Sequence, residues 1–95
     1  MKAQIEAILT QALDVFNNKT QDYGSPDVGL NVEGGFVWLW GKINRLKSLV
    51  WDNELDYDDK QKVLTTYDTL LDILVYCAIT LAILQNEMKQ EEGLK

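Results

Sequence analysis

Trp38 and Gly41 are the residues in this sequence whose types and spacing point most directly to a chemical role. They lie three residues apart in the segment 36–49, where the other residues favour one amphipathic helix. A glycine inside an exposed helix costs about 1 kcal/mol relative to alanine, so Gly41 needs a reason. An indole beside a missing side chain is typical of a small apolar pocket for an aromatic or apolar molecule. The alternative is ordinary packing, in which the tryptophan is core and the glycine marks a close helix crossing.

Residue types that are missing or wrongly spaced exclude several other kinds of site. The 95 residues contain no histidine, so imidazole catalysis and the usual zinc sites are excluded. Gly34 and Gly35 lack the spacing and the lysine of a phosphate-binding loop, although their amides could meet an anion at a helix start. The acidic cluster in residues 54–59 does not match a calcium loop, and a solvated linker with a helix cap explains it better.

Composition and charge indicate one domain covering residues 1–95. The net charge is -6 and the pI is near 4.4, so no nucleic-acid partner is expected. The single cysteine, Cys77, lies in an apolar run, which favours a buried side chain and a cytoplasmic location. The N-terminus lacks the apolar core of a signal peptide. The apolar run 69–84 is interrupted by Asp72 and is shorter than the ~20 residues of a membrane span, so no membrane partner is expected.

The periodicity of the apolar residues predicts an all-α fold with three main helices. The first covers about residues 2–18, the second begins at 33–36 and ends near 51, and the third covers about 59–89. The predicted core positions are Ile5, Ile8, Leu9, Ala12, Leu13 and Phe16 in the first helix, and Val37, Trp40, Ile43, Leu46, Leu49 and Val50 in the second.

The connections between these helices also have sequence signals. Turn-forming residues between 19 and 31 predict a loop, and a long loop in so small a domain is often functional. Asp58 or Asp59 is expected to cap the third helix. Residues 87–95 are polar and are expected to form a loose tail.

The third helix is too long for the other two to cover. At 1.5 Å per residue it would extend roughly 45 Å, and its apolar residues fall on more than one side. We therefore expect a homodimer or homotetramer built on this helix, the alternative being a monomer with a bent or frayed C-terminus. Trp40 and Trp51 are candidates either for that interface or for the core.

Three motifs in a fixed order resemble a known family. They are Lys19 with Asp22-Tyr23-Gly24, then Phe36-Val37 with Lys42 and Arg45-Leu46, then Asp68-Thr69-Leu70-Leu71-Asp72-Ile73 with Tyr76. Over about residues 15–80 they are similar to the small phage and bacterial proteins related to MazG, which are all-α nucleotide pyrophosphohydrolases. The resemblance implies an oligomeric MazG-like helical bundle in which carboxylates from two helices hold Mg²⁺ against the phosphates of a nucleotide.

The chain departs from the family pattern at the expected active site. Relatives usually carry an arginine and an acidic residue where this sequence has Trp38 and Gly41, and a second acid where it has Leu64. Leu74 occupies a position that is commonly alanine. These replacements convert a charged cleft into an apolar one, which is what redesign of an engineered protein for an aromatic or apolar ligand would produce.

Four charged residues of the family pattern remain. Asp68 and Asp72 lie four apart on one helix face and could hold Mg²⁺, although two carboxylates from one helix would bind it weakly. Lys42 and Arg45 could clamp phosphates. In the alternative interpretation, these two cations neutralise the two aspartates as ion pairs and the site is a relic.

The sequence therefore leads to three functional hypotheses. The first is a non-catalytic MazG-like scaffold whose former nucleotide site binds a small aromatic or apolar molecule without a cofactor. The second is a Mg²⁺-dependent nucleoside triphosphate pyrophosphohydrolase, and the third is an oligomerisation module. The expected ligand-binding residues are Trp38, Gly41, Leu64, Tyr67, Asp68, Leu71 and Val75.

Overall fold

The protein is an elongated arrangement of α-helices. The computed structural model describes residues 1–23 and 31–94, and in this part of the chain it contains three α-helices and no strand. They are α1 (Lys2–Tyr23), α2 (Val32–Lys47) and α3 (Lys60–Leu94), with a π-helical turn, η1 (Ser48–Asp52), at the end of α2. The all-α class and the long third helix are thereby confirmed.

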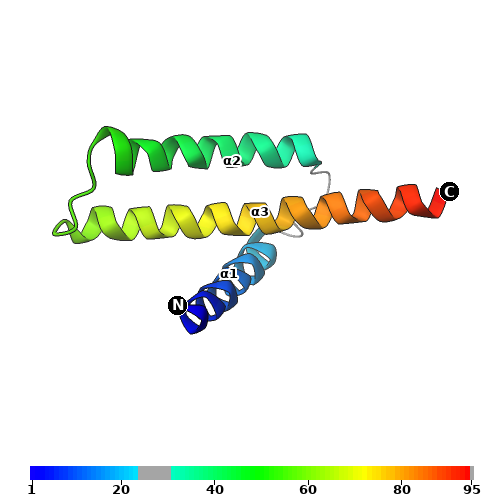
Figure 1. Cartoon of the computed structure of the whole chain (residues 1–95), viewed down its shortest axis with the longest axis horizontal. Coiled ribbons are helices and arrows are strands. Elements are labelled where there is room, and N and C mark those ends of the chain that lie inside the picture. The colour runs from blue at the N-terminus through cyan, green and yellow to red at the C-terminus, as the bar shows by residue number, and fades with distance from the viewer. Residues whose placement is uncertain (24–30, 95) are drawn as a thin grey trace.

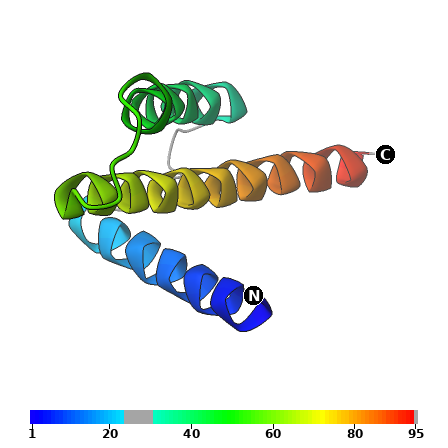
Figure 2. The ribbon, with the colours of Figure 1, turned by 60° about the vertical axis from the view of Figure 1, so that its left-hand side comes forward.

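The long helix α3 lies between the other two helices (Figure 1). Helix α2 runs antiparallel beside its first half, and α1 crosses it on the opposite side, as the rotated view also shows (Figure 2). The molecule extends 55 × 29 × 29 Å and its radius of gyration is 15.8 Å. A compact chain of this length would have a radius of gyration of about 12 Å. The protomer is thus open rather than close-packed.

Side-chain caps define where α2 and α3 begin. The Asn31 side chain accepts a hydrogen bond from the Gly34 amide at 2.7 Å, which satisfies one of the free amides of the first turn of α2. Asp59 does the same for α3 by accepting a bond from the Lys62 amide at 3.2 Å. The predicted cap at Asp59 is therefore confirmed.

Two predicted helix ends are wrong in the same direction. Helix α1 continues to Tyr23, five residues beyond the predicted end, and α3 continues to Leu94 through the predicted loose tail. Asparagine and threonine disfavour a helix interior only slightly, so residues 17–20 do not stop a helix that is already formed. The rest of the predicted loop, residues 24–30, lies outside the described residues.

Helices α2 and α3 meet along two matching rows of residues, which we call the contact rows. Contacts between the side chains fix their alignment: Lys42 reaches Asp72, and a Cβ on Gly35 would meet Thr80. The rows repeat at alternating spacings of three and four residues, as expected for nearly parallel helix axes. They are Gly35, Leu39, Lys42 and Leu46 on α2 with Leu49 on η1, and Thr69, Ile73, Tyr76, Thr80 and Ile83 on α3.

This alignment corrects the predicted core of α2. Leu46 and Leu49 face α3 as expected, but the other four predicted core residues are exposed. Those four are Val37, Trp40, Ile43 and Val50. The helix carries two apolar rows, and periodicity alone does not say which of them faces α3. Gly35 decides it, because without a side chain it permits the close approach to Thr80.

Helix α1 covers the other side of α3 only in part. Ala12 is buried against a core that includes Leu71 and Val75, and the Tyr67 hydroxyl donates a hydrogen bond to the Gln11 side chain at 2.5 Å. Of the six predicted core residues of α1, Ala12 is buried and Phe16 is half-buried. The remaining four, Ile5, Ile8, Leu9 and Leu13, are exposed.

The two helix-interior glycines of α2 should respond in opposite ways to alanine. A Cβ on Gly35 would lie 3.0 Å from Thr80 Cγ2 and 3.2 Å from its Cβ, so Gly35→Ala must push the helices apart. We expect it to lower the free energy of unfolding by about 1–3 kcal/mol. A Cβ on Gly41 meets nothing within 4 Å, so Gly41→Ala should raise this free energy by about 0.4–1 kcal/mol.

Urea denaturation followed by circular dichroism measures both effects. The double variant Gly35→Ala/Thr80→Ala is the control, because removing the threonine hydroxyl and methyl should restore part of the lost stability. A neutral Gly35→Ala, or a destabilising Gly41→Ala, would contradict the assignment of the contact rows.

Candidate functional site

The predicted ligand-binding residues do not come together in one pocket. Trp38 packs against Tyr76 of α3, with 5.0 Å between the ring centroids and a tilt of 53° between the planes. Gly41, on the same side of α2, faces open space. Gly41 is therefore neither a close helix crossing nor the floor of an enclosed pocket within the protomer. Of the two interpretations drawn from the sequence, the close helix crossing is wrong for Gly41 and applies to Gly35 instead, while a ligand beside Gly41 stays a prediction.

The remaining charged residues of the family pattern lie on this same edge of the α2–α3 pair. Lys42 Nζ lies 3.2 Å from Asp72 Oδ2, and both side chains are mostly buried. The predicted ion pairing is confirmed for these two residues. Asp68 and Arg45 are exposed, each one helical turn from a member of the pair. Among the residues that the structure describes, no group of three or more acidic or cysteine side chains could hold a metal ion.

The other four predicted site residues lie on the side of α3 that faces α1. Leu71 and Val75 are buried in the core, Tyr67 bonds to Gln11, and Leu64 is exposed. Since α1 and α2 lie on opposite sides of α3 (Figure 2), these residues face away from the α2 side, where Trp38 packs on Tyr76. The residues predicted to form one site therefore lie on two separate surfaces. They were chosen from one sequence pattern, and such a pattern includes residues from opposite sides of a helix.

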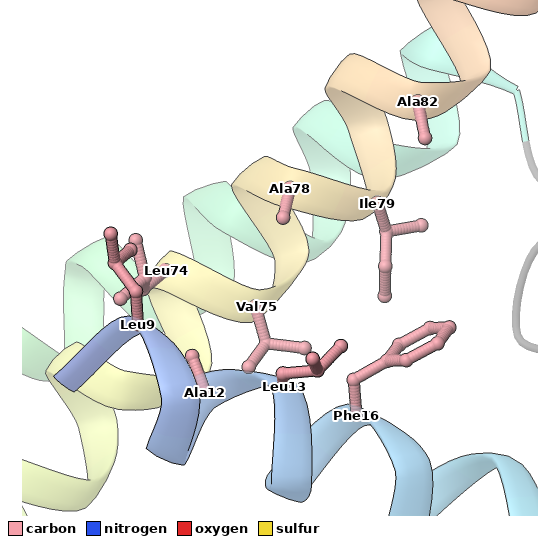
Figure 3. A pocket seen from close by; sticks show the side chains of 9 residues that line it. All are labelled: Leu9, Ala12, Leu13, Phe16, Leu74, Val75, Ala78, Ile79 and Ala82. Carbon is pink, nitrogen blue, oxygen red and sulfur yellow. The ribbon is translucent and has the colours of Figure 1, made fainter. Parts of the chain in front are cut away.

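An apolar groove lies between α1 and α3. Its volume is about 440 Å³. All its lining residues are apolar (Figure 3): Leu9, Ala12, Leu13, Phe16, Leu74, Val75, Ala78, Ile79 and Ala82. Side chains from both helices point into the space between them, while the three alanines leave that space unfilled. The groove therefore offers apolar contact and no proton donor or acceptor from a lining side chain.

One feature of the sequence points to this groove, although the spacing of the apolar residues does not reveal it. Ala78 and Ala82 lie four residues apart on α3, so they share one face of the helix. Small residues on a face that otherwise carries Leu74 and Ile79 leave space opposite another helix. The position of α1 above that face was not available from the sequence. The Tyr67–Gln11 hydrogen bond holds α1 there at 2.5 Å.

Comparison with known proteins assigns no family. No family model, no curated protein and no solved structure matches this chain. What stands is a small all-α protein with three helices in its described residues, of which the third is long.

The Lys42–Asp72 pair should contribute more to stability than a second ion pair in the same protein. The second pair, Lys47–Asp52 at 2.9 Å, is the matched control because its side chains are twice as exposed, at 60% and 48% against 30% and 25%. Water screens an exposed pair more strongly. A double-mutant cycle with Lys42→Met and Asp72→Asn should give a coupling of about 0.5–1 kcal/mol.

The same cycle with Lys47→Met and Asp52→Asn should give about half that coupling or less. Urea denaturation of the single and double variants measures both values. Equal couplings for the two pairs would show that the Lys42–Asp72 contact has no special place in the fold.

Proposed function

We propose that this chain is a non-catalytic binding module on a MazG-like helical scaffold, and that it holds a small apolar or aromatic molecule in the groove between α1 and α3. The observation that carries this proposal is the groove itself, whose volume of about 440 Å³ is lined by nine apolar residues and is partly open to solvent. Small-molecule sites usually have 300–1,000 Å³ and a mostly apolar lining. We expect the protein to act in the cytoplasm, where a lone cysteine stays reduced.

The arrangement of charges supports the non-catalytic part of the proposal. Mg²⁺ needs several oxygen ligands in octahedral geometry. Asp72 is held by Lys42, and the positions where the resembling family carries acidic residues are Gly41 and Leu64. Asp68 would therefore have to recruit a metal almost alone. The hydrolase hypothesis assigns Mg²⁺ to Asp68 and Asp72 and phosphate to Lys42 and Arg45, and it is the alternative against which the proposal is tested.

The apolar lining also sets the strength of binding. A two-ring aromatic molecule that buries about 250 Å² of its surface would gain roughly 6 kcal/mol from leaving water. Before the cost of immobilising the molecule is subtracted, that gain corresponds to a dissociation constant of tens of micromolar, so this is the tightest binding expected. Tighter binding would need a polar anchor, and the hydroxyl of Tyr67, already bonded to Gln11, is the polar group on the same α1–α3 contact.

Filling the groove should abolish binding of a neutral aromatic probe. N-phenyl-1-naphthylamine is suitable, because it is uncharged and its fluorescence rises in apolar surroundings. In Ala78→Phe the new ring occupies the space between the helices, so we expect the affinity for the probe to fall at least tenfold. Ala7→Phe is the matched control, since Ala7 is exposed and lies outside the groove lining. Equal probe binding by the two variants would exclude the groove as the site.

The protein should not hydrolyse nucleotides. With each of the four dNTPs and Mg²⁺, we expect pyrophosphate release no faster than from the Asp68→Asn variant, since too few carboxylates remain to hold the metal. A coupled pyrophosphate assay measures this. Steady release by the unchanged protein that Asp68→Asn abolishes would contradict the proposal and identify a hydrolase.

A further inference from the structure

Helix α3 carries an apolar row that α1 and α2 leave mostly uncovered, and of its members only Leu74 also lines the α1–α3 groove. Each member directly follows a residue of the contact row of α3, so the row is turned by one residue, or 100°, from the α2 interface. Leu70, Leu81 and Leu84 are exposed, while Leu74 and Cys77 are half-buried. The row consists of Leu70, Leu74, Cys77, Leu81 and Leu84. Most of a long apolar helix face is therefore in water in the protomer.

Helix α2 carries an equivalent exposed row. Its members also follow contact-row residues by one position, and they are Phe36, Trp40, Ile43, Lys47 and Val50. The rings of Phe36 and Trp40 stack with 6.2 Å between their centroids. The one charge in this row, on Lys47, is neutralised by Asp52, whose two oxygens lie 2.9 and 3.1 Å from its Nζ.

The two rows lie on the same side of the α2–α3 pair. Both are displaced from the contact rows by one residue in the direction of the chain, and the two helices are antiparallel (Figure 1). On each helix the exposed row is turned from the contact row by the same angle and in the same sense along the chain. Because α2 and α3 are antiparallel and their contact rows face each other, these two rotations bring both exposed rows to the same side of the pair. The two rows therefore form one broad surface, which we call the open face. Trp38, with the Lys42–Asp72 pair, belongs to the other side.

The exposed area is large enough to require a partner. The protomer exposes 7488 Å², whereas a monomeric protein of 10.9 kDa exposes about 5,600 Å². The excess of about 1,900 Å² exceeds the roughly 800 Å² that each partner contributes to a standard interface. Covering the open face of one protomer would therefore remove a large part of this excess.

We propose that the open face is covered by the open face of a second copy of this chain, so that two α2–α3 pairs stack into a four-helix bundle. A symmetric dimer places like surfaces against each other, which requires that the surface carry no uncompensated charge. The open face meets this requirement, although the whole chain has a net charge of -6. Stacked in this way, α3 has helices on every apolar side. The α1–α3 groove shares only Leu74 with this surface, and the inference does not use the proposed ligand.

A lipid surface is the competing occupant. By length and composition alone the segment Lys60–Lys89 could cross a membrane, and most of its apolar part is not buried in this structure. This differs from the sequence prediction, which considered the shorter run 69–84. Helices that lie on membranes carry rows of lysine and arginine beside the apolar face. The open face carries Lys47 alone, paired with Asp52, so self-association is favoured.

Two tryptophans of α2 test the interface directly. Trp40 lies on the open face and Trp38 on the opposite side, and their exposed fractions are nearly equal, at 57% and 52%. Sedimentation velocity of the full chain should give twice the protomer mass at micromolar concentration. Trp40→Glu and Leu81→Glu should each weaken the dimer at least a hundredfold, whereas Trp38→Glu should change its dissociation constant less than threefold. Circular dichroism checks that each variant remains helical.

Four results would overturn the proposal. The unchanged protein could sediment as a monomer up to about 200 μM, well above the concentrations at which interfaces of standard size associate. Trp38→Glu could dissociate the dimer as strongly as Trp40→Glu. Either open-face variant, when helical, could remain fully dimeric. The unchanged protein could float with phosphatidylcholine vesicles as a monomer, which would assign the open face to lipid. Because the first and last results use the unchanged protein, a variant that fails to fold leaves the test intact.

Discussion

The structure depends on one constraint, which is that α3 is apolar around most of its circumference. One side packs on α2, a second lies under α1, and a third carries the leucines from Leu70 to Leu84. Apolar surface left in water costs about 25 cal/mol per Å², so a helix of this kind is stable only when it is surrounded. The short sector with Asp68 and Asp72 is where α3 tolerates water. The positions of the other helices, and the proposed second copy, follow from this requirement.

Small and polar residues decide how α2 lies on α3. Gly35 has no side chain to hold the backbones apart at Thr80, and Lys42 spans the interface to reach Asp72. Turning α2 by one residue would bury Phe36 and Trp40, but it would also carry Lys42 away from Asp72 and Gly35 away from Thr80. The ion pair and the glycine contact both fit the present rotation, in which Phe36 and Trp40 remain outside. The same rotation creates the open face.

The three sides of α3 differ in what they can do. The α1 side has an apolar groove, because alanines on both helices leave unfilled space between larger residues. The edge beside Asp72 combines an ion pair with an aromatic contact between Trp38 and Tyr76, and its charges neutralise each other. The α1 side suits an apolar ligand. The edge beside Asp72 would need more acidic residues to bind a nucleotide with its metal ion. The side with Leu70, Leu81 and Leu84 suits a protein surface. These three surfaces lie on different sides of the same helix, α3.

The sequence by itself determined the helical class, the three helices, an aspartate cap at residue 58 or 59 and the excess apolar surface of α3, because these depend on local propensity and on spacing along one helix. The ion pairing was also foreseeable, since Lys42 and Asp72 carry opposite charges on helices expected to pack. Only the tertiary structure decided which apolar row of α2 faces α3, that Gly35 rather than Gly41 lies at the crossing, and that Trp38 is separated from Val75. Each of these depends on the rotation of one helix about its axis relative to another, and a periodic pattern does not contain that angle.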